Sequence, residues 1–429
     1  MTRNPQPAND KTRQRLRNRY RAEKRFRLYG VLALLCGGLA LSTLLWDVFS
    51  TGYSAFWRTE VLVDIHLSPT SLGLSTPVTE ISLKKGKYKK AIRQAFYAYF
   101  EEVTSRQERR QLAKLLSPGA SLALKAYLFK NIDSLGRTVS IWVPIASDLD
   151  QVHKGNAPRD IDQSQRRIND LQLGWYDRLI EESRVRSRFN LAFFVNGDSR
   201  SAELAGIGSA LVGSFYALMI CLLLSFPIGV AAAVYLEEFA PRSRFTDFVE
   251  ANINNLAAVP SIIFGLLGLA IILNVFGLPR GTPLVGGIVL SLMTLPTIII
   301  ACRASIKSVP PSVRQAALAM GASPMQTVLH HVLPLAMPGT LTGTIIGLAQ
   351  ALGETAPLLM IGMVAFVISV PGTPLDPSSA LPVQVYLWAE SAERGFVEKT
   401  SAAIMVIIMF LILMNLAAVL LRSRFERKW

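Results

Sequence analysis

Glu354 is an acidic residue inside an apolar stretch, where an ionisable side chain needs a chemical reason. Gln350 precedes it by four residues, so a helix places both side chains on one face, and Thr355 follows directly. A charged acid at mid-membrane costs about 2.5–3.5 kcal/mol even on the lenient insertion scale. We therefore expect Glu354 to face a hydrated path or a partner cation. The alternative is a protonated Glu354 that is hydrogen-bonded to Gln350.

The helix expected to carry this acid, residues 338–366, has small residues at every fourth position. Small residues at that spacing allow two membrane helices to approach closely; here they are Gly339, Gly343, Gly347, Ala351 and Thr355. Pro357 cannot donate a hydrogen bond to the Gly353 carbonyl, so we expect a kink beside Glu354. Thr294 and Thr297 are further candidates for the path, although helix–helix hydrogen bonds explain them more simply.

Residues 303–337, called the coupling segment below, connect two apolar stretches. Pro310 and Pro311 favour the start of a helix, and Gly321 favours a left-handed helix end. Ser323 fits an N-cap before Pro324, so two short helices are expected. Small side chains at Ala316, Ala317 and Gly321 would let a partner protein settle closely on them. The alternative is a compact turn without a partner.

The composition indicates a polytopic helical membrane protein. Of 429 residues, 51% are hydrophobic and 17% are charged, whereas soluble proteins carry nearer a quarter. Several apolar runs reach about 20 residues, enough to cross a bilayer. We expect six spans, one before and five after a hydrophilic insertion. The expected parts are a basic tail (1–27), a first span (28–49), a hydrophilic domain (50–204), a five-span core (205–421) and a second basic tail (422–429).

The hydrophilic domain is expected to be mixed α/β. Residues 59–67 alternate apolar and polar side chains as a strand does, and residues 88–103 have helical spacing. Residues 138–146 and 188–195 are predicted as further strands, with a charged helical stretch between them. Five lysines between positions 84 and 90 suit an anion or, more simply, a solvated helix start. Asp148, Asp150 and His153 are interpreted as a polar turn rather than a metal site.

Charge distribution predicts the topology. The net charge is +15, and nineteen Lys and Arg flank the spans on the side of both termini and of the coupling segment. Three, Arg280, Arg394 and Lys399, lie in the short loops on the other side. The positive-inside rule therefore places the termini and the coupling segment in the cytoplasm and residues 50–204 outside. No G-x-x-x-x-G-K-[ST] motif occurs, so the chain is expected to be no enzyme and any ATP to act on another subunit.

The coupling segment resembles the "EAA" loop of ABC-transporter permeases, through Gln315-Ala316-Ala317, Gly321 and Val332-Leu333-Pro334. Residues 205–421 resemble the PstA-type phosphate permeases through four phrases in the family's order. These phrases are SFPIGVAAAVYLEEFAP, NINNLAAVPSIIFGLLGLA, LPTIII and ALGETAPLL. The hydrophilic domain resembles an extension that some bacterial members carry.

The resemblance implies the permease subunit of an ATP-driven phosphate importer. Its implied partners are a second permease of the PstC type, a PstB-type ATPase dimer that holds ATP and Mg²⁺, and a PstS-type binding protein. It also implies that Arg314, Gln315, Leu333 and Pro334 belong to the surface that the ATPase grips. Gln315 and Gln350 replace a glutamate and an arginine of the family pattern, so we expect the second permease to supply the anion's positive charge. Alternatives are a permease for another oxyanion, sulfate or molybdate, and a membrane-anchored ligand sensor.

Overall fold

The computed structural model describes residues 10–74, 80–364 and 366–425, which form two compact units divided between Thr51 and Gly52. The first unit is essentially one helix, α1 (Asp10–Gly52). The described part of the basic tail and the predicted span 28–49 are therefore one continuous helix. Residues 1–9 and 426–429 of the two predicted tails lie outside the described residues.

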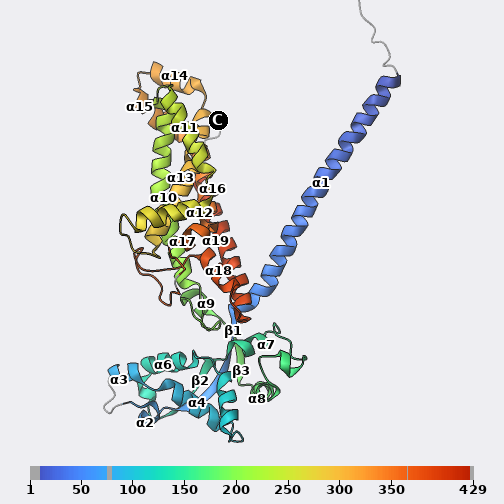
Figure 1. Cartoon of the computed structure of the whole chain (residues 1–429), viewed down its shortest axis with the longest axis vertical. Helices are drawn as coiled ribbons and strands as arrows, with labels where there is room; N and C mark the ends of the chain where they lie inside the picture. The colour runs from blue at the N-terminus through green and yellow to red at the C-terminus, as the bar shows by residue number, and fades with distance from the viewer. Residues whose placement is uncertain (1–9, 75–79, 365, 426–429) are drawn as a thin grey trace, which may run out of the picture. The chain divides into compact units, whose positions relative to one another are not determined.

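The hydrophilic domain contains a three-stranded antiparallel sheet with strand order β2-β1-β3 (Figure 1). Its strands are β1 (Trp57–His66), β2 (Thr138–Pro144) and β3 (Val185–Phe189), which confirms the strands predicted at 59–67 and 138–146. The strand predicted at 188–195 is wrong beyond Phe189, because a short helix, α9 (Leu191–Val195), follows. Asn190 ends the ladder: its backbone N–H donates to Phe56 O and its amide to Ala55 O.

The core of this domain lies between the sheet and a set of helices. Val61, Val63 and Ile65 alternate along β1 and are almost fully buried. They pack with side chains of α4 (Tyr88–Tyr99), α6 (Ala120–Lys130) and α8 (Asp170–Glu181). The predicted helix 88–103 ends at Tyr99, four residues early. The shorter helices are α2 (Pro69–Leu72), α3 (Glu80–Lys85), α5 (Arg106–Leu112) and α7 (Ser147–His153).

Five helical stretches in the described residues are long and apolar enough to cross a membrane, or six if one bent pair counts as a span. After α1 come α10 (Gly208–Val234), α13 (Pro283–Lys307), α16 (Leu333–Gly353) and α19 (Gly395–Phe425). The bent pair is α11 (Arg244–Ala257) and α12 (Ser261–Leu267), at 103° to each other. The apolar run 255–276 does not form one straight helix, because Pro260, with its fixed φ and no N–H, lies at the bend.

The helix predicted at 338–366 is also interrupted. It ends at Gly353, and α17 (Ala356–Met360) begins shortly after it, followed by a long loop and α18 (Leu381–Ala389). Pro357 lies in the first turn of α17, which fits its missing N–H. The break thus leaves Glu354 at the C-terminal end of α16 and not inside a continuous helix.

Candidate functional site

The coupling segment folds into the two short helices predicted from its proline and glycine positions. They are α14 (Pro311–Ala319) and α15 (Pro324–Thr327), and α15 continues through a π-helical turn, η7 (Val328–Val332), into α16. Gly321 between them has a φ of +89°, a conformation that favours glycine. Ser323 caps α15 and forms a capping box with Gln326, which supplies two hydrogen bonds at the helix start.

The exposed surface of this segment differs from the one expected. Gln315, Ala316 and Gly321 are exposed, but Ala317 is buried within the chain, so it cannot form part of a docking surface. Larger apolar side chains take its place: Met320 is 89% exposed, and Leu318 and Met325 are about half exposed. At the end of the segment Leu333 is half-buried and Pro334 is exposed. Sequence reasoning missed Met320 because a single methionine beside a glycine gives no periodic signal.

Arg314 is held by hydrogen bonds within the chain. Its Nη2 and Nε donate to Glu238 Oε1 at 2.7 and 3.0 Å, and Nη1 donates to Val309 O at 2.8 Å. The Arg314 and Glu238 side chains are 24% and 12% exposed. Glu238 belongs to η5 (Tyr235–Phe239), the π-helical end of α10. This bidentate pair therefore ties α14 to α10.

Arg303 forms a second connection of the same kind at the end of α13. Its guanidinium lies 2.7 Å from Glu237 and 2.6 Å from Glu250, and its side chain is 12% exposed. Lys307 approaches Glu237 at 3.5 Å and is largely exposed. Together these six residues, called the ionic cluster below, connect α10, α11, α13 and α14. They are Glu237, Glu238, Glu250, Arg303, Lys307 and Arg314.

The face of α16 that carries the predicted path residues is open in this chain. Gln350 is exposed, as is Ile346 one turn before it, and Glu354 and Thr355 are half-buried. Among the described residues, no hydrogen bond joins the side chains of Gln350 and Glu354, so the paired arrangement considered above is not present. The other candidate helix, α13, presents Thr297 half-buried.

Thr294 does not lie on this open face. It is 1% exposed between α13 and α10, and its hydroxyl lies 3.3 Å from Cys221 Sγ. This is the helix–helix hydrogen bond that the sequence offered as the simpler explanation. The Thr294 hydroxyl thus serves the packing of α13 on α10.

The glycine stripe of α16 faces α13, which runs beside it (Figure 1). A Cβ at Gly339 would overlap the Ser305 side chain, and a Cβ at Gly343 would overlap that of Ala301. Gly347 has more room, since Thr294 and Ile298 lie 3.7 Å from a Cβ there. Backbone approach at the first two positions holds α16 against α13, and α13 carries Arg303 near its C-terminal end. The helix that ends beside Glu354 is thus packed directly against a helix of the ionic cluster.

A second polar cluster connects the hydrophilic domain to α19, and sequence reasoning missed it. Lys154 Nζ lies 2.6 Å from Asp150 and 2.9 Å from Glu398, and all three side chains are less than a tenth exposed. Ser54 and Asn156 donate to the other Glu398 oxygen. Asp150 also accepts from the Thr59 N–H at 2.9 Å, so each of these buried charges has a partner. We call Ser54, Asp150, Lys154, Asn156 and Glu398 the junction network.

The polar turn predicted around residues 148–153 is therefore wrong, because these residues form α7 and Asp150 is buried. Tyr176 OH lies 2.7 Å from His153 Nδ1, and burial lowers the pKa of His153. In the described ranges, no group of three His, Cys, Asp or Glu side chains is arranged to hold a metal ion.

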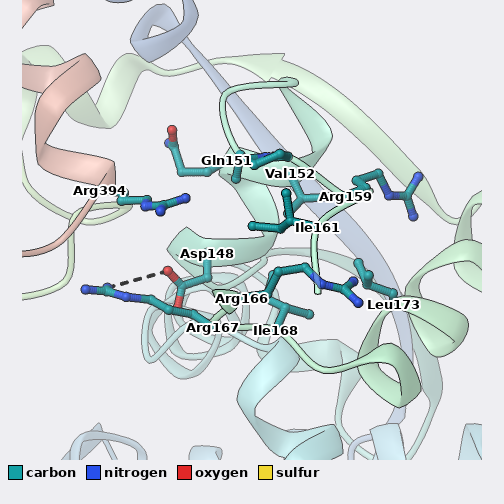
Figure 2. Close-up of a pocket in the computed structure, with 12 residues that line it drawn as sticks. Asp148, Gln151, Val152, Arg159, Ile161, Arg166, Arg167, Ile168, Leu173 and Arg394 are labelled. Atoms are coloured by element: carbon teal, nitrogen blue, oxygen red, sulfur yellow. Dashed lines mark ion pairs between the residues drawn. The ribbon is translucent and has the colours of Figure 1, made fainter. Parts of the chain in front are cut away.

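A small pocket beside the junction network is lined by four arginines (Figure 2). Arg167 lies 3.7 Å from Asp148 and donates to Ala392 O at 3.0 Å. The cavity has a volume of about 30 Å³, enough for a water molecule or two but little more. Arg167 therefore joins the domain to the loop before α19, and Arg394 belongs to that loop. Arg159 and Arg166 instead pair with Asp177 and Asp170 of the domain itself.

Glu203, beside this junction, gives a pH-dependent prediction. It is 9% exposed and accepts from Ser117 Oγ at 2.6 Å, and burial raises the pKa of its carboxyl. The folded state therefore disfavours the charged form, and stability is lost as pH rises from the unfolded pKa through the raised folded one. We expect Glu203→Gln to gain stability relative to the native chain as pH rises above the ordinary pKa of glutamate, about 4.3. Thermal melts of both proteins at pH values below and above this pKa measure it; parallel curves would contradict it.

Two family descriptions match this chain. Residues 13–163 match a domain of unknown function, DUF3333, and residues 225–429 match the binding-protein-dependent transport system inner membrane component. The second match contains the coupling segment, the open face of α16 and all six residues of the ionic cluster. The first contains β1, β2 and α7.

Individual relatives are similar to part of this chain. The phosphate transport system permease protein PstA of Haemophilus influenzae is 30% identical over 227 residues, 53% of this chain and 79% of that protein. PstA 1 of Mycobacterium tuberculosis (strain H37Rv) is 31% identical over 220 residues, 51% of this chain and 70% of that one. The probable ABC transporter permease protein YqgI of Bacillus subtilis is 35% identical over 174 residues, which are 40% of this chain. The match spans 58% of YqgI, less than two thirds of its length. A solved inward-facing structure of the MetNI methionine ABC transporter covers 52% of this chain and 95% of its own, with 20% identity and a TM-score of 0.41.

Proposed function

Since the chain belongs to the family of binding-protein-dependent inner-membrane transport components, as a PstA-type permease with an N-terminal extension, we propose that it is the membrane subunit of an ATP-driven phosphate importer. It is a multi-pass inner-membrane protein. We further propose that both termini and the coupling segment are cytoplasmic and that residues 50–204 are periplasmic, as the positive-inside rule indicates.

One observation supports the coupling role above the others. The tip of the coupling segment exposes three apolar side chains to solvent, Leu318, Met320 and Met325. Exposed apolar patches are typical of surfaces that bind another protein. The same segment is tied through Arg314 and Glu238 to α10. A protein that binds the tip can thus move the membrane helices as one body.

The proposed assembly has four kinds of subunit. A PstC-type permease completes the path opposite the open face of α16, where Gln350, Glu354, Thr355 and Thr297 contribute polar groups. It also supplies the positive charge that the anion needs, because Gln350 is neutral. A PstB-type ATPase dimer, with ATP and Mg²⁺ bound to it, holds the coupling segment, and a PstS-type protein delivers phosphate.

Uptake of radiolabelled phosphate tests the substrate. In cells that lack their own phosphate importer, co-expression of this chain with its three partners should give saturable uptake that depends on an intact ATPase. Excess sulfate or molybdate should leave it unchanged. Uptake of sulfate or molybdate in place of phosphate would assign the chain to the other oxyanions.

Met320→Asp tests the coupling surface. A charge at this exposed apolar position should leave the fold intact but oppose burial against the ATPase, so we expect uptake to fall about tenfold. The ATPase should be lost when the complex is pulled down through this chain. Ser312→Asp is the matched control: it adds the same charge to the first turn of α14, where a helix favours an acid. Normal ATPase recovery with Met320→Asp would contradict the docking role of this surface.

A further inference from the structure

The hydrophilic domain carries a basic groove that the transport mechanism above does not use. It opens between the start of α4, α5 and α6 and has a volume of about 860 Å³. Seven of its thirteen lining residues are cationic and none is acidic. The cations are Lys84, Lys87, Lys89, Lys90, Arg93, Arg109 and Lys125.

The start of α4 lies in this groove without a cap. Lys87 is at the N-cap position and no side chain accepts a hydrogen bond from the first turn. The positive end of the helix dipole lies beside the positive charges of Lys87, Lys89 and Lys90. Repulsion between them destabilises the helix when no anion is bound. A bound anion would satisfy the unpaired N–H groups and offset the repulsion.

Neighbouring carboxylates do little to neutralise the groove. Among the described residues, the only salt bridge made by its seven cations is the exposed pair Lys84–Glu80, at 3.0 Å. Arg109 is held in place, because its Nε donates to Val103 O at 3.0 Å and its guanidinium lies 5.8 Å from the Tyr97 ring centroid. At least one cation is thus positioned at the groove's edge in advance of binding.

We propose that this groove binds a small soluble anion with several phosphate groups, such as a short linear polyphosphate. The groove has the volume of a small-molecule site. A single orthophosphate would leave most of the cations without a partner, whereas a chain of phosphate groups spans them. Lysine, arginine and free helix N–H groups are the donors that phosphate oxygens accept. The site does not depend on what the membrane path transports.

Calorimetric titration of the full-length chain in nanodiscs of zwitterionic lipid tests the proposal, with tripolyphosphate as the probe. We expect saturable binding at one site, at least about tenfold tighter than binding of orthophosphate or citrate, and weakening steeply with salt. Lys87→Gln/Lys90→Gln should weaken it about tenfold or more, because each charged hydrogen bond contributes substantially. Lys114→Gln/Lys130→Gln, at exposed lysines of the same domain outside the groove, should change it less than about twofold.

Thermal melts of the same proteins separate a ligand site from a merely structural one. Without ligand, Lys87→Gln/Lys90→Gln should melt at a higher temperature than the native chain, since it removes repulsion at the start of α4. At one concentration of tripolyphosphate, the melting temperature should rise more for the native chain and the control than for this variant. Equal binding of citrate and tripolyphosphate, equal binding by the variant and the control, or no binding at all would overturn the proposal.

Discussion

Arg314→Ala is expected to lower ATP-driven uptake about tenfold or more while the chain still reaches the membrane. The change removes the guanidinium that Glu238 shares with the carbonyls of Val309 and Ile306. A largely buried carboxylate without its partner costs about 3 kcal/mol. The coupling segment would then no longer move rigidly with α10. When both activities are measured in the same reconstituted vesicles, the Arg314→Ala complex should still hydrolyse ATP but take up much less phosphate.

Two further variants show whether the pair itself matters. Arg314→Ala/Glu238→Gln removes the unpaired charge, so we expect it to recover the stability lost in Arg314→Ala but not the uptake. Lys307→Ala is the matched control, because its contact with Glu237 is long and its side chain is 71% exposed; such pairs contribute little. If Arg314→Ala transports as well as Lys307→Ala does, the ionic cluster has no role in transmission.

Local features of this fold were predictable because the residues that determine them are neighbours in the chain. The start of α15 follows from Ser323 and Pro324, and the end of α14 follows from Gly321. The alternation along residues 59–67 likewise predicted β1. The strand predicted beyond Phe189 failed because Asn190 bonds to Ala55 and Phe56, more than a hundred residues away in the chain.

The candidate site was less predictable, since its key contacts join distant segments. Arg314 lies in the coupling segment, but nothing near it in sequence indicates that Glu238, 76 residues earlier, would bind it. The sequence shows that Thr294 is polar, which suggests a path residue. It does not show that Cys221, 73 residues earlier, is its partner. Residues 255–276 were apolar enough for a span, yet the angle at the bend depends on how α11 and α12 pack.

The junction network changes the interpretation of the N-terminal extension. A domain that is attached only by a linker would move freely. Here, buried charges of the domain and of α19 pair with each other, which holds the domain against that helix. Asp150 comes from the domain and Glu398 from the start of α19, and Lys154 lies between them. Any event that shifts the domain must therefore also pull on α19 or break this network.

Lys154→Met is expected to destabilise the chain by about 3–5 kcal/mol, because it leaves two buried carboxylates without their shared cation. The methionine keeps most of the side chain's volume, so lost packing contributes little. The melting temperature, followed by circular dichroism in detergent, should fall by roughly 10 °C. Lys154→Met/Glu398→Gln should recover much of this loss, since the amide oxygen introduced at position 398 would still accept from Ser54 and Asp150 would keep the Thr59 N–H. Lys114→Met, at an exposed lysine of the same domain, should change the melting temperature little. A similarly small change with Lys154→Met would mean that the junction network does not hold the domain to α19.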